Sequence, residues 1–141
     1  MKISARNVLP GTVEKVEKGA VNSEVQLKLK GGETVTAIIT NSSVASLGLT
    51  SGKAAFAIVK ASEVMIGKEI DPSKLSARNI LSGEVTQVTD GAVNSEVLLR
   101  LPGGAEIVAS ITKTSAHALA LKAGVRASAI VKASNVLIGV D

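Results

Sequence analysis

The sequence has 141 residues, of which 45% are hydrophobic, only one is aromatic and none is cysteine, and its formal net charge is +4. The absence of cysteine excludes disulfides and thiolate metal sites, and the scattered basic residues lack the blocks that are typical of proteins binding the nucleic-acid backbone. No apolar run has the length of a signal-peptide core or a membrane span, so we expect a cytoplasmic protein without a membrane partner.

Residues 8–16 and 21–30 are predicted to form the first pair of strands. In the second segment Val25, Leu27 and Leu29 alternate with polar residues, which places them on one inward face. Pro10 and Gly11 predict a bend or bulge in the first segment.

Gly31 and Gly32 predict a tight turn, after which residues 34–40 return antiparallel. Residues 41–43 predict a helix N-cap, followed by one or two helical turns that stop at Gly48. Residues 54–61 form a nearly continuous apolar run, typical of a strand buried on both faces. Residues 64–66 either extend this strand or form a last short one.

This pattern recurs 72 residues later. The heptapeptide at 19–25 returns letter for letter at 91–97, and 37 of 69 aligned positions are identical. We therefore expect two domains of one kind, at 1–68 and 74–141, joined by a linker at 69–73. Five short strands and one short helical turn per copy predict an all-β fold of two tandem OB-like small β-barrels.

Catalysis has little support in the sequence. The single histidine, His117, has Ala45 as its counterpart in the first copy, and there is no cysteine nucleophile. Glu24 and Glu96 fall on the outward phase of a strand, where we expect them to meet solvent or pair with a base. No metal-ligand cluster and no glycine-rich phosphate motif are present, so we expect neither an enzyme nor a metal-cation site.

A nucleic-acid-binding OB protein is the main competing interpretation. Such surfaces stack bases on aromatic side chains. Phe56 is the only aromatic residue, and Ser128 replaces it in the second copy. We therefore expect no nucleic-acid partner.

Hydroxyl, backbone-donor and cationic residues recur at the strand ends of both copies. Each has a simpler explanation alone, because Ser and Thr cap turns and Arg or Lys forms surface ion pairs. Together they form a set of donors with positive charge and no carboxylate, which suits a deprotonated oxyanion. The set is Ser4, Arg6, Thr40, Lys60, Ala61 and Ser62, with Ser76, Arg78, Thr112, Lys132, Ala133 and Ser134.

Four motifs carry a family resemblance: Ser-Ala-Arg-Asn-x-Leu-x-Gly-x-Val, Gly-Ala-Val-Asn-Ser-Glu-Val, the strand-end Thr and Val-Lys-Ala-Ser. They resemble the molybdate-binding Mop (molbindin) domain, and the tandem arrangement resembles the di-Mop molbindins. The resemblance implies a Mop/TOBE-type barrel per copy, molybdate or tungstate as ligand, and a homotrimer of chains equivalent to six Mop domains.

The resemblance also implies two kinds of site. An interdomain pocket would take Ser4, Ala5 and Arg6 from one domain and Thr40, Lys60, Ala61 and Ser62 from its neighbour, with Ser76, Ala77, Arg78, Thr112, Lys132, Ala133 and Ser134 in the second copy. A second anion site near the three-fold axis would use Ala20, Val21, Asn22, Ser23, Ala92, Val93, Asn94 and Ser95. The alternative for these eight residues is that they only pack subunits together.

In relatives the same module is attached to a DNA-binding regulator or a transporter ATPase, as the ligand-sensing part. These 141 residues contain neither attachment. We therefore expect molybdenum storage and homeostasis, with regulation or transport as the alternative.

Overall fold

Alternating apolar side chains form the strands of both halves of the protein. The computed structural model describes residues 1–141. Its strands are β1 (Asn7–Lys18), β2 (Asn22–Leu29), β3 (Thr34–Thr40), β4 (Ala54–Val59), β5 (Met65–Gly67), β6 (Asn79–Asp90), β7 (Asn94–Arg100), β8 (Glu106–Thr112), β9 (Arg126–Val131) and β10 (Leu137–Gly139). Its helices are α1 (Asn41–Leu47), α2 (Lys113–Ala118) and the 3-10 turns η1 (Ala61–Glu63), η2 (Pro72–Lys74) and η3 (Ala133–Asn135). None of the helices has both the length and the hydropathy that a membrane-spanning segment requires.

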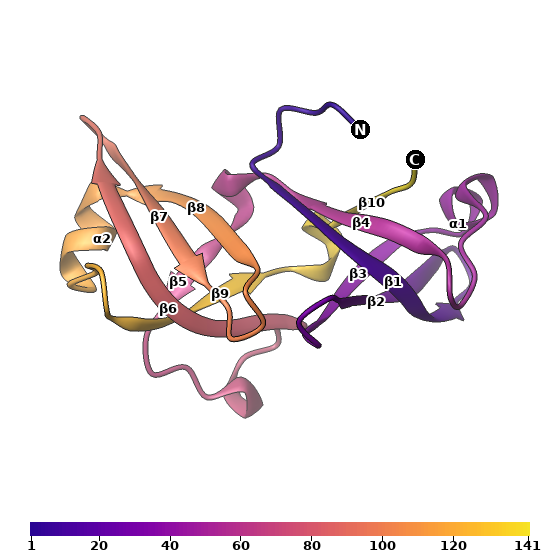
Figure 1. Ribbon diagram of the computed structural model, residues 1–141. Coiled ribbons are helices and arrows are strands. Elements are labelled where there is room, and N and C mark those ends of the chain that lie inside the picture. The colour runs from indigo at the N-terminus through magenta and orange to yellow at the C-terminus, as the bar shows by residue number, and fades with distance from the viewer.

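The strands form two antiparallel five-stranded sheets that exchange their last strands. The sheet orders are β10-β4-β1-β2-β3 and β5-β9-β6-β7-β8. The short final strand of each copy therefore completes the sheet of the other, as Figure 1 shows for β10 beside β4 and β5 beside β9. Each sheet curls until its two edge strands approach each other, which gives the expected pair of OB-like barrels.

One apolar core runs through both halves. A single cluster of 25 buried residues contains side chains from both copies. All of them are Val, Leu, Ile or Ala, as the near absence of aromatic residues requires. Copies of about 70 residues bury little surface alone, so sharing a core and a strand stabilises both.

Two asparagines from the repeated Ser-Ala-Arg-Asn motif tie the halves together. The Asn7 side chain donates from Nδ2 to the Val108 carbonyl (2.8 Å) and accepts from the Val108 amide (2.7 Å). Asn79 does the same with Thr36, at 2.8 and 2.7 Å. Val108 and Thr36 lie on β8 and β3, the edge strands, so each amide satisfies backbone groups that a neighbouring strand leaves free.

The predicted strands of the first copy are largely confirmed. Residues 34–40 form β3 with the expected bounds, and Val25, Leu27 and Leu29 on β2 are buried. The apolar run at 54–61 is shorter than expected as a strand, because β4 ends at Val59 and Ala61 begins a 3-10 turn. Ala54 at its start is exposed, so only the later part is buried on both faces.

The bulge expected at Pro10 and Gly11 lies elsewhere. The register of β1 against β2 shifts between Val13 and Lys15. Pro10 pairs with β4 but lies beyond the last residue of β1 that pairs with β2. Its missing N–H therefore costs no hydrogen bond to β2. Gly11 instead allows close approach, since a Cβ there would lie 2.6 Å from the Lys28 carbonyl oxygen.

The N-cap of the first helix also lies one residue before the range 41–43 that the sequence predicted. Thr40 is the N-cap of α1, and its Oγ1 accepts a hydrogen bond from the Ser43 amide at 3.1 Å. Thr112 caps α2 in the same way through Ser115. Gly48 ends α1 with φ 60°, as predicted.

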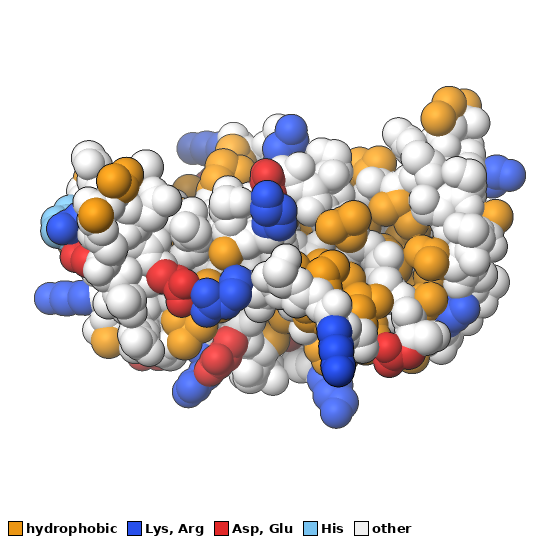
Figure 2. Space-filling model, turned by 90° about the horizontal axis from the view of Figure 1, so that it is seen from above, with side chains coloured by type: hydrophobic (Ala, Val, Ile, Leu, Met, Phe, Trp, Pro, Cys, Tyr) orange, Lys and Arg blue, Asp and Glu red, His pale blue; other side chains and the backbone are white.

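Apolar side chains remain on the surface near the exchanged strands. Ile3 and Leu137 are 49% and 57% exposed, and Met65 and Leu75 are 49% and 41% exposed. The face in Figure 2 shows apolar atoms between basic side chains that stand as separate groups.

Candidate functional site

Two grooves contain most of the predicted site residues. Groove 1 is lined by Ile3, Ser4, Ala5, Arg6, Ile58, Lys60, Ala61, Ser62, Glu96, Ser110 and Leu137. Groove 2 is lined by Ile38, Met65, Ile66, Gly67, Ile70, Leu75, Ser76, Ala77, Arg78, Ile130, Lys132, Ala133 and Ser134. Their volumes are similar, about 520 Å³ and about 570 Å³.

The internal repeat relates the two grooves. Ten of the eleven lining positions of groove 1 recur in groove 2 when 72 is added or subtracted. Each groove also takes residues from both copies, since Ser110 and Leu137 belong to the second copy and Ile38 and Met65 to the first. The predicted Ser, Ala, Arg and Lys residues therefore come together twice, at the junction of the halves.

Lys60 and Lys132 are the unpaired cations of these grooves. Each follows a buried strand and is the N-terminal flanking residue of a 3-10 turn, with φ −66°. Their side chains are exposed and take part in no salt bridge. Ser62 and Ser134 sit on the following turns, and their hydroxyls make no hydrogen bond within the protein. The same holds for Ser4 and Ser76, so free hydroxyl donors line the same grooves as the two ammonium groups.

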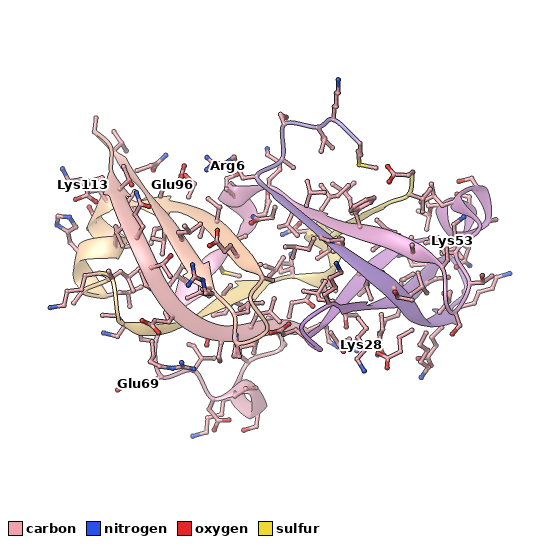
Figure 3. The ribbon with its side chains drawn as sticks, in the orientation of Figure 1. Arg6, Lys28, Lys53, Glu69, Glu96 and Lys113 are labelled. Carbon is pink, nitrogen blue, oxygen red and sulfur yellow. The ribbon has the colours of Figure 1, made fainter.

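The two arginines are already paired. Arg6 donates to both carboxylate oxygens of Glu96, at 2.8 and 2.9 Å, and Figure 3 shows the two residues meeting between the halves. Arg78 and Glu24 form the equivalent pair, with both distances 2.6 Å. The hydrogen bonds from the arginine lower the pKa of each glutamate, and those to the glutamate raise the pKa of each arginine.

This pairing corrects the expectation of a donor set without carboxylates, because Glu96 lines groove 1. The guanidinium charge of Arg6 is largely balanced by Glu96. Lys60 is therefore the cation of groove 1 whose charge no carboxylate balances, while Arg6 joins the halves through Glu96.

The strand-end threonines are placed differently from the rest of the set. Thr112 lies in an adjoining groove with Ser62 and Ser110, whereas Thr40 lines neither groove 1 nor groove 2. Within one chain, Ser62 of the first copy is thus grouped with Thr112 of the second, and Thr40 is not among the residues that line groove 1 with Lys60. Both threonine hydroxyls cap a helix.

The two heptapeptides form the tips of the β1–β2 and β6–β7 hairpins. Val21 and Val93 are 70% and 73% exposed there, and Ala20 and Ala92 are also exposed. The strand residues after each tip are Asn22 and Ser23, and Asn94 and Ser95.

The serines of these tips are less free to bind than the sequence indicated. Ser23 is buried and donates to Asn41 Oδ1, and Ser95 is buried and donates to Asp90 Oδ1, both at 2.5 Å. Their hydroxyl hydrogens are therefore already used in hydrogen bonds within the protein.

His117 is bonded to the same carboxylate as Ser95. Its Nε2 lies 2.9 Å from Asp90 Oδ2. The carboxylate thus stands between the hydroxyl and the imidazole, so His117 is not placed to take a proton from Ser95 as a catalytic base would. Hydrogen bonds from Ser95 and His117 lower the pKa of Asp90.

Sequence reasoning missed Asn7, Asn79 and Ser110. The asparagines were visible as part of a repeated motif, but their backbone partners lie 101 and 43 residues away. Ser110 gave no signal, because its counterpart in the first copy is Ile38.

Comparison with known proteins gives consistent matches over nearly all of the chain. The TOBE domain model matches residues 3–66 and 75–138. The molybdenum-pterin-binding protein MopA of Rhodobacter capsulatus is 48% identical over 138 residues, which cover 98% of this chain and 52% of MopA. The molybdenum transport protein ModE of Azotobacter vinelandii is 44% identical over 141 residues, 99% of this chain and 52% of ModE. The chain therefore spans about half the length of these relatives.

A solved structure matches over the full length. The cytoplasmic molybdate-binding protein ModG, solved with molybdate bound, superposes with a TM-score of 0.96 at 50% identity, and the match covers 100% of both chains.

Proposed function

The chain belongs to the TOBE-domain family, and on that basis we propose that it binds molybdate, with tungstate as an analogue, in grooves 1 and 2. The observation that carries the proposal is the unpaired ammonium of Lys60 or Lys132 at a strand end, with free serine hydroxyls beside it, repeated in both grooves. A tetrahedral dianion offers only acceptor oxygens, so it needs donors and a balancing cation.

The wider role we propose is molybdenum storage and homeostasis in the cytoplasm, by a binding protein and not an enzyme. The ModG relative is described as cytoplasmic and molybdate-binding. No side-chain set in the grooves pairs a nucleophile with a base. The binding role is the same whether the two repeats act alone or as the sensing part of a regulator or transporter.

We also propose a homotrimer. Both grooves are open, and the apolar residues Ile3, Leu137, Met65 and Leu75 on their walls are about half exposed. Covering such residues with further copies of the chain would bury apolar surface and remove water from a bound anion. Light scattering coupled to size-exclusion chromatography tests this, and a stable monomer at micromolar concentration contradicts it.

Titration calorimetry with molybdate, sulfate and phosphate tests the ligand. Lys60→Ala removes one charge-assisted hydrogen bond, worth roughly 1.5–3 kcal/mol, so affinity at groove 1 should fall by about ten- to a hundredfold. Lys28→Ala is the matched control, since Lys28 is exposed on β2 outside both grooves and its loss changes the net charge equally. Unchanged affinity in the double variant Lys60→Ala/Lys132→Ala would show that the grooves are not the site.

The aromatic content and the face in Figure 2 give no support to nucleic-acid binding. Phe56, the only aromatic residue, is half-buried, and acidic and apolar side chains lie among the basic ones on that face. A lack of any gel shift with single-stranded oligonucleotides at low salt is the expected result.

A further inference from the structure

Among the ten lining positions that grooves 1 and 2 share, one changes polarity. Of the ten positions that recur, seven hold identical residues. Two more differ only in which apolar side chain they hold, Ile3 in place of Leu75 and Leu137 in place of Met65. The remaining position holds Ser110 in groove 1 and Ile38 in groove 2. One groove therefore offers a hydroxyl where the other offers only hydrocarbon.

The hydroxyl of Ser110 is free to bind a ligand. Ser110 lies on β8 directly opposite Glu96, and Ile38 lies on β3 directly opposite Glu24, so the two positions are equivalent in register. The Ser110 side chain is half-buried and makes no hydrogen bond within the protein. Ile38 is 36% exposed and directs an apolar side chain into the same place.

The carboxylate of Glu96 does not cancel the advantage that the Ser110 hydroxyl gives to groove 1. Its carboxylate lines groove 1, but both of its oxygens accept hydrogen bonds from Arg6, and Glu24 is bonded in the same way to Arg78. The two halves therefore have equivalent ion pairs. Among the lining positions that both grooves share, the one that differs in polarity is the position of Ser110 in groove 1 and Ile38 in groove 2. Groove 2 also has Ile70 from the linker on its wall, which adds hydrocarbon and no donor.

We propose that the two grooves are unequal anion sites, with groove 1 the tighter one, and that the residue at position 110 or 38 sets the difference. The inference rests on the molybdate-binding function proposed above. An anion oxygen in groove 1 can accept one more hydrogen bond, from the Ser110 hydroxyl. The equivalent oxygen in groove 2 faces isoleucine, so it loses its hydrating water and gains no protein donor in its place. One hydrogen bond to a charged group corresponds to a difference of about tenfold or more in dissociation constant.

Two substitutions test the inference: Ser110→Ala removes the hydroxyl from groove 1, and Ile38→Ser places in groove 2 the residue that groove 1 already holds. Calorimetry of the wild type with molybdate should give two classes of groove site, the tight one weakened in Lys60→Ala and the weak one weakened in Lys132→Ala, each by about ten- to a hundredfold. Ser110→Ala should weaken the tight class by about tenfold and leave the weak class unchanged. Ile38→Ser should strengthen the weak class by a similar factor. Ser51→Ala is the control, since Ser51 lies outside both grooves and its counterpart is Ala123.

Crystals grown with limiting molybdate give an independent readout. The anomalous signal should show molybdenum in groove 1 first in the wild type, and in both grooves equally in Ile38→Ser. Equal filling in the wild type, or a tight class that survives Ser110→Ala, would overturn the inference while leaving the proposed function in place. If the wild type binds no molybdate by either method, the proposed function fails and this inference fails with it.

Discussion

Replacement of Asn7 by alanine should weaken the junction between the two halves. The Asn7 amide makes hydrogen bonds of 2.8 and 2.7 Å to the carbonyl and amide of Val108, and the two residues are only 2% and 8% exposed. Alanine leaves both backbone groups buried without a partner, at roughly 1–3 kcal/mol each. The free energy of unfolding should therefore fall by roughly 2–5 kcal/mol.

Such a loss is easily measured. For a chain of this size 1 kcal/mol corresponds to roughly 2–4 °C in Tm, so Asn7→Ala should melt about 5–15 °C below the wild type. Far-UV circular dichroism is the suitable signal, because the sequence has no tryptophan or tyrosine. Samples must be free of ligand and equal in concentration, since ligand binding and self-association both raise the apparent Tm.

Two further variants show whether the hydrogen bonds are responsible. Asn135→Ala removes an asparagine side chain that makes no hydrogen bond, and should change the free energy of unfolding by less than about 0.5 kcal/mol. Asn7→Asp keeps the shape of the side chain but buries a carboxylate facing the Val108 carbonyl. It should be at least as destabilising as alanine at neutral pH and recover partly in acid, when the protonated carboxyl can donate. If Asn7→Ala matches Asn135→Ala in stability, the reasoning is refuted.

Three more outcomes are expected. Gly103→Ala should lower the free energy of unfolding by about 1–3 kcal/mol in urea titrations, because the new Cβ would lie 2.4 Å from the Gly31 Cα across the junction. Thr112→Val should lower Tm by a few degrees through loss of the α2 N-cap, worth roughly 1 kcal/mol, while Thr112→Ser should not. The folded-state pKa of Glu96 is lowered by Arg6, so the stability from this pair is complete above the ordinary glutamate pKa and is lost as the pH falls through the lowered value. Glu96→Gln should therefore make the acid-side decline of Tm shallower, and an unaltered decline would count against the pair.

The local pattern of the sequence determines the strands and the repeat. Side chains in a strand alternate between two faces, so Val25, Leu27 and Leu29 identify an inward face without knowledge of what it packs against. Gly31 and Gly32 mark a turn for an equally local reason. The retention of Lys60 and Ser62 in both copies indicated an anion site, because the chemistry of a donor set can be read from residue types alone.

Only the tertiary structure decides which segments meet. Residues 65–67 have the same short apolar pattern whether they pair with their own copy or with the other, so the exchange of β5 and β10 has no local signature. The partner of Arg6 is Glu96, 90 residues away, and through that pairing a predicted anion ligand also links the halves. Ser110 becomes part of groove 1 for the same reason, since it reaches Lys60 and Ser62 only when the second copy folds against the first.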